Sequence, residues 1–317
     1  MDYRPRRKKI ILKCKSNSFF LLFLFLSFHI SFGQNGLDVF LKQSDTLNTS
    51  RKNTVLAVEA IVVTGALVGL NQLWYADYPK SDFHFINDNA EWLQMDKAGH
   101  IYSSYHLGRF GAEMLEWSGA SQKDQLIFGA GMGFAFLTAV DVLDGFSSEW
   151  GASSGDVIAN ASGTALFVFQ ELLWKEQRII PKFSFHTTKY AQYRPNVLGS
   201  SLAEQILKDY NGQTYWLSVN LHSFYKGSKI PKWLNLAIGY GADGMSTGNV
   251  EDNGLFFIEK TERSRRFYLS LDIDLTKIET KSCFVKTIFS VFNTLKIPAP
   301  TIEYLHHEGF RGHISYF

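Results

Sequence analysis

The stretch FYLSLDIDL, residues 267–275, alternates apolar and polar side chains without a break. The apolar residues at the odd-numbered positions fall on one face of an extended chain, and the polar residues fall on the other. This period of two predicts a β-strand. The other segments that favour strands are residues 215–224, 234–242, 302–305 and 313–317. Residues 213–317 are therefore predicted to form a mainly antiparallel β domain, with one amphipathic helix at residues 283–295.

Two arrangements of these strands are possible. A terminal Phe317 after amphipathic strands is typical of outer-membrane barrels. Four to six predicted strands fall short of the roughly eight that such barrels need, and Arg311 and His313 interrupt the outward apolar alternation. We expect a one-sided sheet covered by helices, with a barrel completed by oligomerisation as the alternative.

Apolar helices precede the strands. Helical spacing of apolar residues predicts helices at residues 55–74, 96–117, 126–140 and 156–174. The first is near membrane-spanning length with Glu59 as its only charge, and the first, third and fourth lack a charged outer face. In the third, Gly129 and Gly133 lie one turn apart, which lets another backbone approach closely. The predicted fold class is α+β: a membrane-associated four-helix bundle over residues 54–175, followed by the β domain.

The N-terminus predicts export. Residues 1–15 carry seven Lys/Arg and one Asp, and the apolar run FFLLFLFLSFHI at residues 19–30 follows. Residues 1–33 are therefore predicted to be a signal peptide, because the apolar run is too short to span a membrane. Residues 34–53 are predicted to be a polar arm and residues 176–212 a connecting segment. The expected location is the cell envelope, facing the periplasm, at either the inner or the outer membrane.

Charge excludes one class of partner. The whole chain has a formal net charge of +2, with 32 basic and 30 acidic residues. The leader holds seven of the basic residues and one of the acidic ones, so residues 34–317 carry 25 and 29, a net of −4. Nucleic-acid binding needs a clustered basic surface, and the exported part of the chain does not predict one.

No recognised catalytic signature is present in the sequence. GASSG at residues 151–155 has the spacing of a nucleophile elbow, but a helix precedes it where an elbow needs a strand, so Ser153 is predicted to cap a helix. GYGADG at residues 239–244 has the dinucleotide spacing, but a loop follows it where a helix is needed. No cofactor is therefore expected.

Polar residues nevertheless gather at the ends of the apolar helices. Asp96 and His100 share a face at the start of the second helix, Asp141 and Asp144 end the third, and Asp156 and Asn160 share a face of the fourth. If the helices alternate up and down, these residues meet at one end of the bundle. The candidate catalytic residues are His100, Glu149 and Asp156, and the candidate binding residues are Asp96, Lys97, Tyr105, Asp144 and Asn160.

The chemistry of this set has two interpretations. His100 with two or three carboxylates suits general acid/base catalysis, or a hard-to-intermediate divalent metal whose identity stays open. Ionisable groups at membrane depth are costly, so their clustering indicates a site. The alternative is a buried ion-pair network that only stabilises the helices.

The same residues carry a resemblance to a known family. The segments DKAGHIYSSY (96–105) and DGFSSEWGASSGDVIAN (144–160) resemble the YfiM-like family of predicted periplasmic lipoproteins of unknown function. The order of Asp-Lys, His, Tyr, Glu, Asp and Asn is more distantly similar to VanZ-like membrane proteins. PKWLNLAIGYGADGM (231–245) and FYLSLDIDLTKI (267–278) look like the C-terminal extension of the longer, two-part members. The site residues that the resemblance implies are Asp96, Lys97, His100, Glu149, Asp156 and Asn160.

One departure from that family concerns lipidation. A lipoprotein needs a cysteine just after the apolar part of the leader, where this chain has Ser31-Phe32-Gly33-Gln34. Lipidation is therefore not expected, and the helices would have to attach the chain to the membrane.

Two classes of function follow. The first is a structural or interaction protein of the envelope, with another envelope protein as its partner. The second is a membrane-surface enzyme or a binding site for a lipid or lipid-linked headgroup. The sequence leaves the oligomeric state open.

Overall fold

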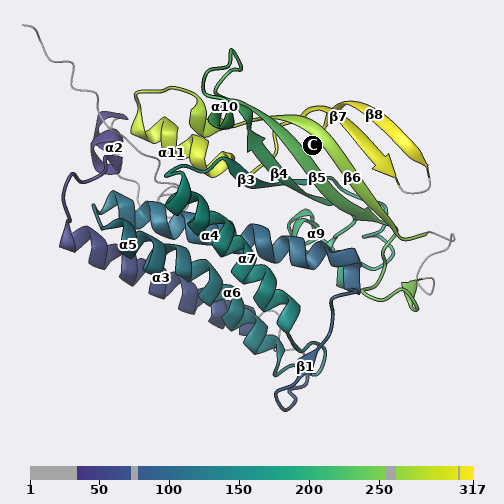
Figure 1. Ribbon diagram of the computed structural model, residues 1–317. Helices are drawn as coiled ribbons and strands as arrows, with labels where there is room; N and C mark the ends of the chain where they lie inside the picture. The colour runs from purple at the N-terminus through teal and green to yellow at the C-terminus, as the bar shows by residue number, and fades with distance from the viewer. Residues whose placement is uncertain (1–33, 73–77, 254–261, 306–307) are drawn as a thin grey trace, which may run out of the picture.

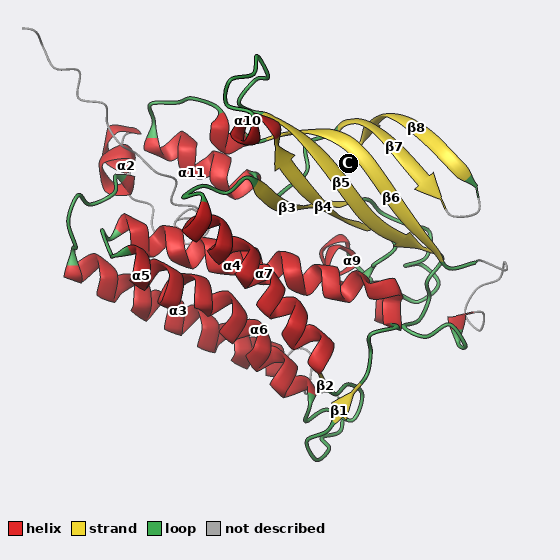
Figure 2. Cartoon of the chain, viewed as in Figure 1, coloured by secondary structure: helices red, strands yellow, loops and turns green. Residues whose placement is uncertain are grey.

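The computed structural model describes residues 34–72, 78–253, 262–305 and 308–317 (Figure 1). The predicted signal peptide lies outside these residues. Figure 2 shows a helical layer on one side and a β-sheet on the other, so the fold class is α+β, as predicted.

The helical layer is built from the predicted apolar segments. Its long helical segments in the described residues are α3 (Thr49–Leu70), α4 (Met95–Trp117), the continuous α5–η3–α6 segment (Gln122–Asp144) and α7 (Ser154–Leu173). Within the third, α5 covers Gln122–Asp124, η3 covers Gln125–Ala130 and α6 covers Gly131–Asp144. α4 and α7 match their predicted ranges to within two residues, and the third segment extends beyond its range at both ends. α3 begins six residues before its predicted range, whose last two residues, 73 and 74, lie outside the described residues.

Close packing centres on α4. A Cβ atom added at Gly133 of α6 would lie 2.4 Å from the carbonyl oxygen of Ser104, and one at Gly163 of α7 would lie 2.2 Å from that of Ile101. Both helices therefore approach α4 as closely as glycine allows. In contrast, α3 buries only Val55 and Glu59. The tightly packed unit is thus α4, α6 and α7, with α3 alongside.

The sheet is antiparallel, and its strands follow each other in chain order among the described residues. The strands are β3 (Ile179–Phe185), β4 (Gln213–Asn220), β5 (Leu234–Asp243), β6 (Ser264–Ile273), β7 (Ala299–Leu305) and β8 (Gly309–Tyr316). β3 lies in the segment expected to be a connector.

The sheet is strongly curled. Lys182 on β3 pairs with Asp272 on β6, with 2.8 Å between Nζ and Oδ2, although β4 and β5 lie between these strands. In a flat sheet, strands three positions apart are separated by about 14 Å. Tyr316 on β8 also lies 3.4 Å from Thr214 on β4, measured between their hydroxyl oxygens. These cross-sheet contacts define a concave face.

The concave face buries polar and charged groups beside a cluster of Trp216, Ala237 and Tyr268, and the convex face is apolar. Lys182, Ser218 and Asp272 are fully buried on the concave side, whereas Leu217 and Leu269 on the convex side are 46% and 45% exposed. The apolar face of the strand at residues 267–275 therefore points outward. We expected helices to cover the sheet; they cover only part of its convex face, where Tyr102 of α4 packs against the rings of Phe183 and Tyr215.

The segment expected to be a polar arm contains ordered structure. Residues 34–53 include α2 (Gln34–Leu41) and the first turn of α3. Asp38 of α2 accepts hydrogen bonds from the Ser282 hydroxyl and the Phe284 N–H, which fixes α2 at the start of α11 (Cys283–Phe292).

Short elements complete the chain. They are β1 (Phe85–Ile86), η2 (Glu91–Gln94), β2 (Ala152–Ser153), α8 (Pro195–Leu198), α9 (Leu202–Lys208), α10 (Leu221–Phe224) and η5 (Leu275–Lys277). β1 and β2 pair in parallel and hold the entry to α4 beside the entry to α7.

Candidate functional site

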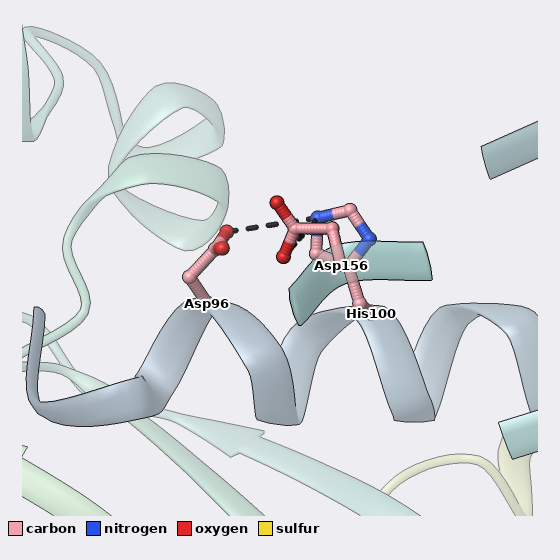
Figure 3. Close-up of side chains that lie close together, drawn as sticks. All are labelled: Asp96, His100 and Asp156. Carbon is pink, nitrogen blue, oxygen red and sulfur yellow. Dashed lines mark ion pairs between the residues drawn. The ribbon is translucent and has the colours of Figure 1, made fainter. Parts of the chain in front are cut away.

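The N-terminal turns of α4 and α7 meet the C-terminal end of α6, and polar side chains fill the junction. This group, which we name the His100 cluster, comprises Asp88, Asp96, Lys97, His100, Asp141, Asp156 and Asn160. Figure 3 shows three of them, with Asp96 and His100 on α4 and Asp156 reaching between them from α7. Two helix starts and one helix end therefore converge, as the helix order predicts.

Local backbone structure positions both helix starts. The chain enters α4 through three consecutive residues with left-handed φ angles, Trp92, Leu93 and Gln94. Ser153 caps α7, because its hydroxyl accepts hydrogen bonds from the N–H groups of Gly155 and Asp156. The same hydroxyl donates to Asp88 Oδ1 at 2.5 Å. Ser153 is thus a helix cap, as predicted.

Lys97 connects three of the carboxylates. Its Nζ lies 2.7 Å from Asp88 Oδ2, 3.0 Å from Asp96 Oδ2 and 2.7 Å from Asp156 Oδ1. These ion pairs join the loop before α4, α4 itself and α7. A lysine in this position neutralises one negative charge and holds the carboxylates at fixed separations.

Asn160 and Asp141 orient the His100 ring. Asn160 donates from Nδ2 to Asp141 Oδ2 at 2.7 Å, so its Oδ1 is left as the acceptor for His100 Nδ1 at 2.9 Å. His100 Nδ1 therefore carries a proton. The other ring nitrogen, Nε2, faces Asp96 Oδ1 and Asp156 Oδ1, each 3.7 Å away. These distances are too long for direct hydrogen bonds.

The His100 cluster holds more negative than positive charge, and this imbalance shifts the pKa values of its side chains. Burial, together with the neighbouring Asp96 charge, raises the pKa of Asp156 to about 7. Burial lowers the pKa of His100, but Asp96, Asp156 and Asp141 outweigh this effect and raise it. Burial raises the pKa of Asp96, but His100 and Lys97 outweigh this and hold it below its usual range. Asp96 is thus the ionised acid, and Asp156 is the carboxyl group that titrates near neutral pH.

A cavity of about 370 Å³ opens beside the cluster. It lies between α4, α9 and the convex face of β3 and β4, and Asp96 and His100 form its polar corner. Tyr210 lines it too and donates from its hydroxyl to Asp96 Oδ1 at 2.9 Å. The remaining wall is mainly aromatic and aliphatic, from Tyr102, Leu137, Phe183, Ile206, Leu207 and Tyr215. Leu207 at its edge is 68% exposed, so the cavity is accessible from outside.

Two of the candidate residues, Glu149 and Tyr105, lie elsewhere. Glu149 is exposed, and it lines a different pocket with Trp150. Tyr105 is fully buried in the core beside Phe167, and its hydroxyl donates to Gln177 Oε1 at 2.9 Å. At the end of α6, Asp141 supplies the carboxylate that contacts Asn160, while the carbonyl of Asp144 accepts a hydrogen bond from the N–H of Ser147. The candidates that do meet are Asp96, Lys97, His100, Asp156 and Asn160.

The sequence pattern does not indicate two residues of the site, Asp88 and Tyr210. Asp88 lies in an irregular loop without periodicity, so no pattern assigns it a direction. Tyr210 lies after α9, and only the packing of α9 against the helical layer brings its hydroxyl to Asp96.

The fold and the cluster define an α+β protein with a buried histidine–carboxylate site among its helices. Residues 82–172 match the family model described as predicted periplasmic lipoprotein (DUF2279). The match includes all seven members of the His100 cluster and supports a location in the cell envelope. The finer YfiM-like and VanZ-like resemblances stay predictions. No curated protein and no solved structure matches the chain.

Proposed function

We propose that this chain is a membrane-associated protein of the cell envelope whose helical layer binds the polar headgroup of a lipid or lipid-linked molecule. One observation carries the proposal: Asp96 and His100 of the His100 cluster form the polar corner of an otherwise mainly apolar, accessible cavity. A pocket with apolar walls and a few convergent polar groups suits a ligand with one polar end.

The outer surface of the sheet supports membrane association. Its convex face exposes Leu217, Ile238 and Leu269 at 46%, 57% and 45% of their surfaces, while the concave face buries charged groups. Apolar-outward and polar-inward alternation is typical of strands that contact lipid. Among the described helices, Thr49–Leu70 and Gln122–Asp144 are also long and apolar enough to cross a membrane, by length and composition.

The cluster suits acid/base chemistry on the bound headgroup. His100 Nε2 faces the space between Asp96 and Asp156, and its pKa and that of Asp156 are raised. A carboxyl group that titrates near neutral pH, as Asp156 does, can accept a proton from a hydroxyl or amine and return it. The excess of carboxylates favours neutral or cationic headgroups over anionic ones.

Membrane association is tested by fractionation of the tagged full chain. We expect the protein to stay in the membrane pellet after carbonate washing and to be released by detergent. Complete release by carbonate would contradict the proposal.

Headgroup binding is tested by mass spectrometry of lipids that co-purify with the chain in detergent. Leu137→Trp fills the cavity and His100→Ala removes its polar corner, so we expect both variants to lose the lipid. Glu149→Gln removes an exposed carboxylate outside the cluster and serves as the matched control. Equal lipid content in all of these proteins would refute the headgroup site.

A structural or interaction role is the second candidate, and the three ion pairs of Lys97 favour it. Breaking a buried ion-pair network costs about 3–5 kcal/mol, so His100→Ala and Asp156→Ala would then melt several degrees lower. If both variants melt like the parent and still lose the lipid, the structural role is excluded.

A further inference from the structure

We infer that Asp96, His100 and Asp156 bind a divalent first-row transition-metal ion of the zinc or manganese type. Their ligand atoms all lie within 4.8 Å of one another. The inference rests on the proposed function, since it assigns a cation to the same polar corner of the cavity.

The spacing of the ligand atoms fits chelation. His100 Nε2 lies 3.7 Å from Asp96 Oδ1 and 3.7 Å from Asp156 Oδ1. Nitrogen and oxygen ligands bind zinc at about 2.0–2.2 Å, which separates two tetrahedral ligands by roughly 3.4 Å. The two histidine–carboxylate separations exceed this value by only a few tenths of an ångström, and the two carboxylate oxygens lie within 4.8 Å of each other. Figure 3 shows the three side chains turned toward one another.

The surroundings of His100 give independent support. A metal-binding histidine usually donates its second ring N–H to an oxygen acceptor, which fixes the ring and its tautomer. Here His100 Nδ1 donates to Asn160 Oδ1, and Asn160 is itself fixed by Asp141. Nε2, which would lose its proton when the ion binds, is thereby directed toward Asp96 and Asp156. An imidazole nitrogen with two carboxylate oxygens suits zinc, manganese or iron(II) better than calcium or copper(I).

One buried carboxylate oxygen beside the His100 ring also lacks a hydrogen bond. Asp141 is only 2% exposed, yet its Oδ1 accepts none and lies 3.9 Å from His100 Nδ1. Asp156 Oδ1, in contrast, is paired with Lys97 Nζ at 2.7 Å and also faces His100 Nε2. Buried polar atoms are almost always satisfied, so the Asp141 oxygen adds negative charge to the cluster that hydrogen bonds do not offset.

The net negative charge of the His100 cluster also favours a bound cation. The cluster contains the carboxylates of Asp88, Asp96, Asp141 and Asp156, and Lys97 compensates one of them. Buried charges are normally paired or bound to metal. A divalent ion offsets most of the excess that remains when His100 is neutral.

The test is calorimetric titration of the metal-stripped full chain in detergent with zinc(II), repeated with cobalt(II). We expect one ion per chain. His100→Asn and Asp156→Asn should weaken binding at least tenfold, and Asn160→Ala, which leaves all three ligands in place, by 10- to 100-fold. Glu149→Gln should bind like the parent. Absence of saturable binding to the parent, or equal binding by all variants, would overturn the inference.

X-ray absorption of the zinc-loaded parent protein gives a readout that needs no variant. One imidazole and oxygen ligands at about 2.0–2.2 Å would support the site, and a spectrum without imidazole scattering would overturn it. The metal inference and the headgroup proposal can be refuted independently of each other. If zinc does not bind while lipid still co-purifies and is lost in Leu137→Trp, only the metal inference is wrong. If zinc binds as expected and no lipid does, only the headgroup proposal is wrong.

Discussion

Gly163→Ala should both destabilise the protein and disturb the His100 cluster. The added Cβ would lie 2.2 Å from the carbonyl oxygen of Ile101 and 2.1 Å from Ser104 Oγ. The serine hydroxyl can rotate away, but the carbonyl belongs to the α4 backbone. Because Cβ contacts under 3.0 Å essentially never occur, α4 and α7 must separate locally by at least about 0.8 Å. Overpacking of this kind costs about 1–3 kcal/mol.

The separation of α4 and α7 would also disturb the His100 cluster. The hydrogen bond from His100 Nδ1 to Asn160 Oδ1, 2.9 Å long, joins the same two helices one turn away. A displacement of that size would stretch it to roughly 3.7 Å, beyond hydrogen-bonding range. We therefore expect Gly163→Ala to lower both the midpoint of urea unfolding and the affinity for zinc.

Gly65→Ala on α3 is the matched control. No heavy atom lies within 4 Å of a Cβ at this position, and alanine favours a helix over glycine by about 1 kcal/mol. This variant should unfold at a higher urea concentration than the parent and bind zinc equally well. If Gly163→Ala unfolds at or above the parent's midpoint, the close contact between α4 and α7 is not present in solution.

Three further predictions concern other parts of the chain. Burial lowers the pKa of Lys296 to about 8 from 10.5, so the folded state binds fewer protons than the unfolded state between these values. Stability should rise with pH from 8 to 10.5, by up to about 1.4 kcal/mol per unit, and unfolding curves of Lys296→Met should lack this rise. Tyr105→Phe removes the hydrogen bond to Gln177 and should cost about 1 kcal/mol in urea unfolding, while co-purification of lipid stays unchanged. Asp38→Ala removes the acceptor for Ser282 and Phe284 and should lower stability by about 1 kcal/mol, with faster amide exchange confined to α2 and α11. Exchange spread over α4 and α7 would contradict that assignment.

Much of the helical layer and about half of the site follow from spacing alone. Asp96 and His100 share a face because they are four residues apart on a helix, and Asp156 and Asn160 do so for the same reason. Spacing does not fix how far each helix is rotated about its axis. The choice between Asp141 and Asp144 at the end of α6 therefore depended on packing against α7, which buries Asp141.

For the sheet, the sequence pattern does not predict which face is buried. Alternation at residues 267–275 predicts a strand with two unlike faces, but the same pattern fits either face turned outward. The sequence pattern does not predict β3, because Pro181 and Lys182 interrupt its apolar residues. Proline is confined to the edges of sheets, and β3 is the first strand in the sheet order. Lys182 is accommodated only because Asp272, three strands away, reaches it across the concave face.

The polarity of the curled sheet has a consequence for calorimetry. Exposing apolar surface to water raises the heat capacity of the unfolded state, and exposing polar surface lowers it. Unfolding the sheet would expose the buried polar side chains of Lys182, Ser218 and Asp272 together with the buried cluster of Trp216, Ala237 and Tyr268, whereas Leu217 and Leu269 already lie on its outer surface. The buried polar groups should therefore make the sheet's contribution to the heat-capacity change of unfolding smaller than that of a sheet with a wholly apolar buried face. The free energy of unfolding would then curve less with temperature, and cold denaturation would be weaker than in proteins with wholly apolar cores.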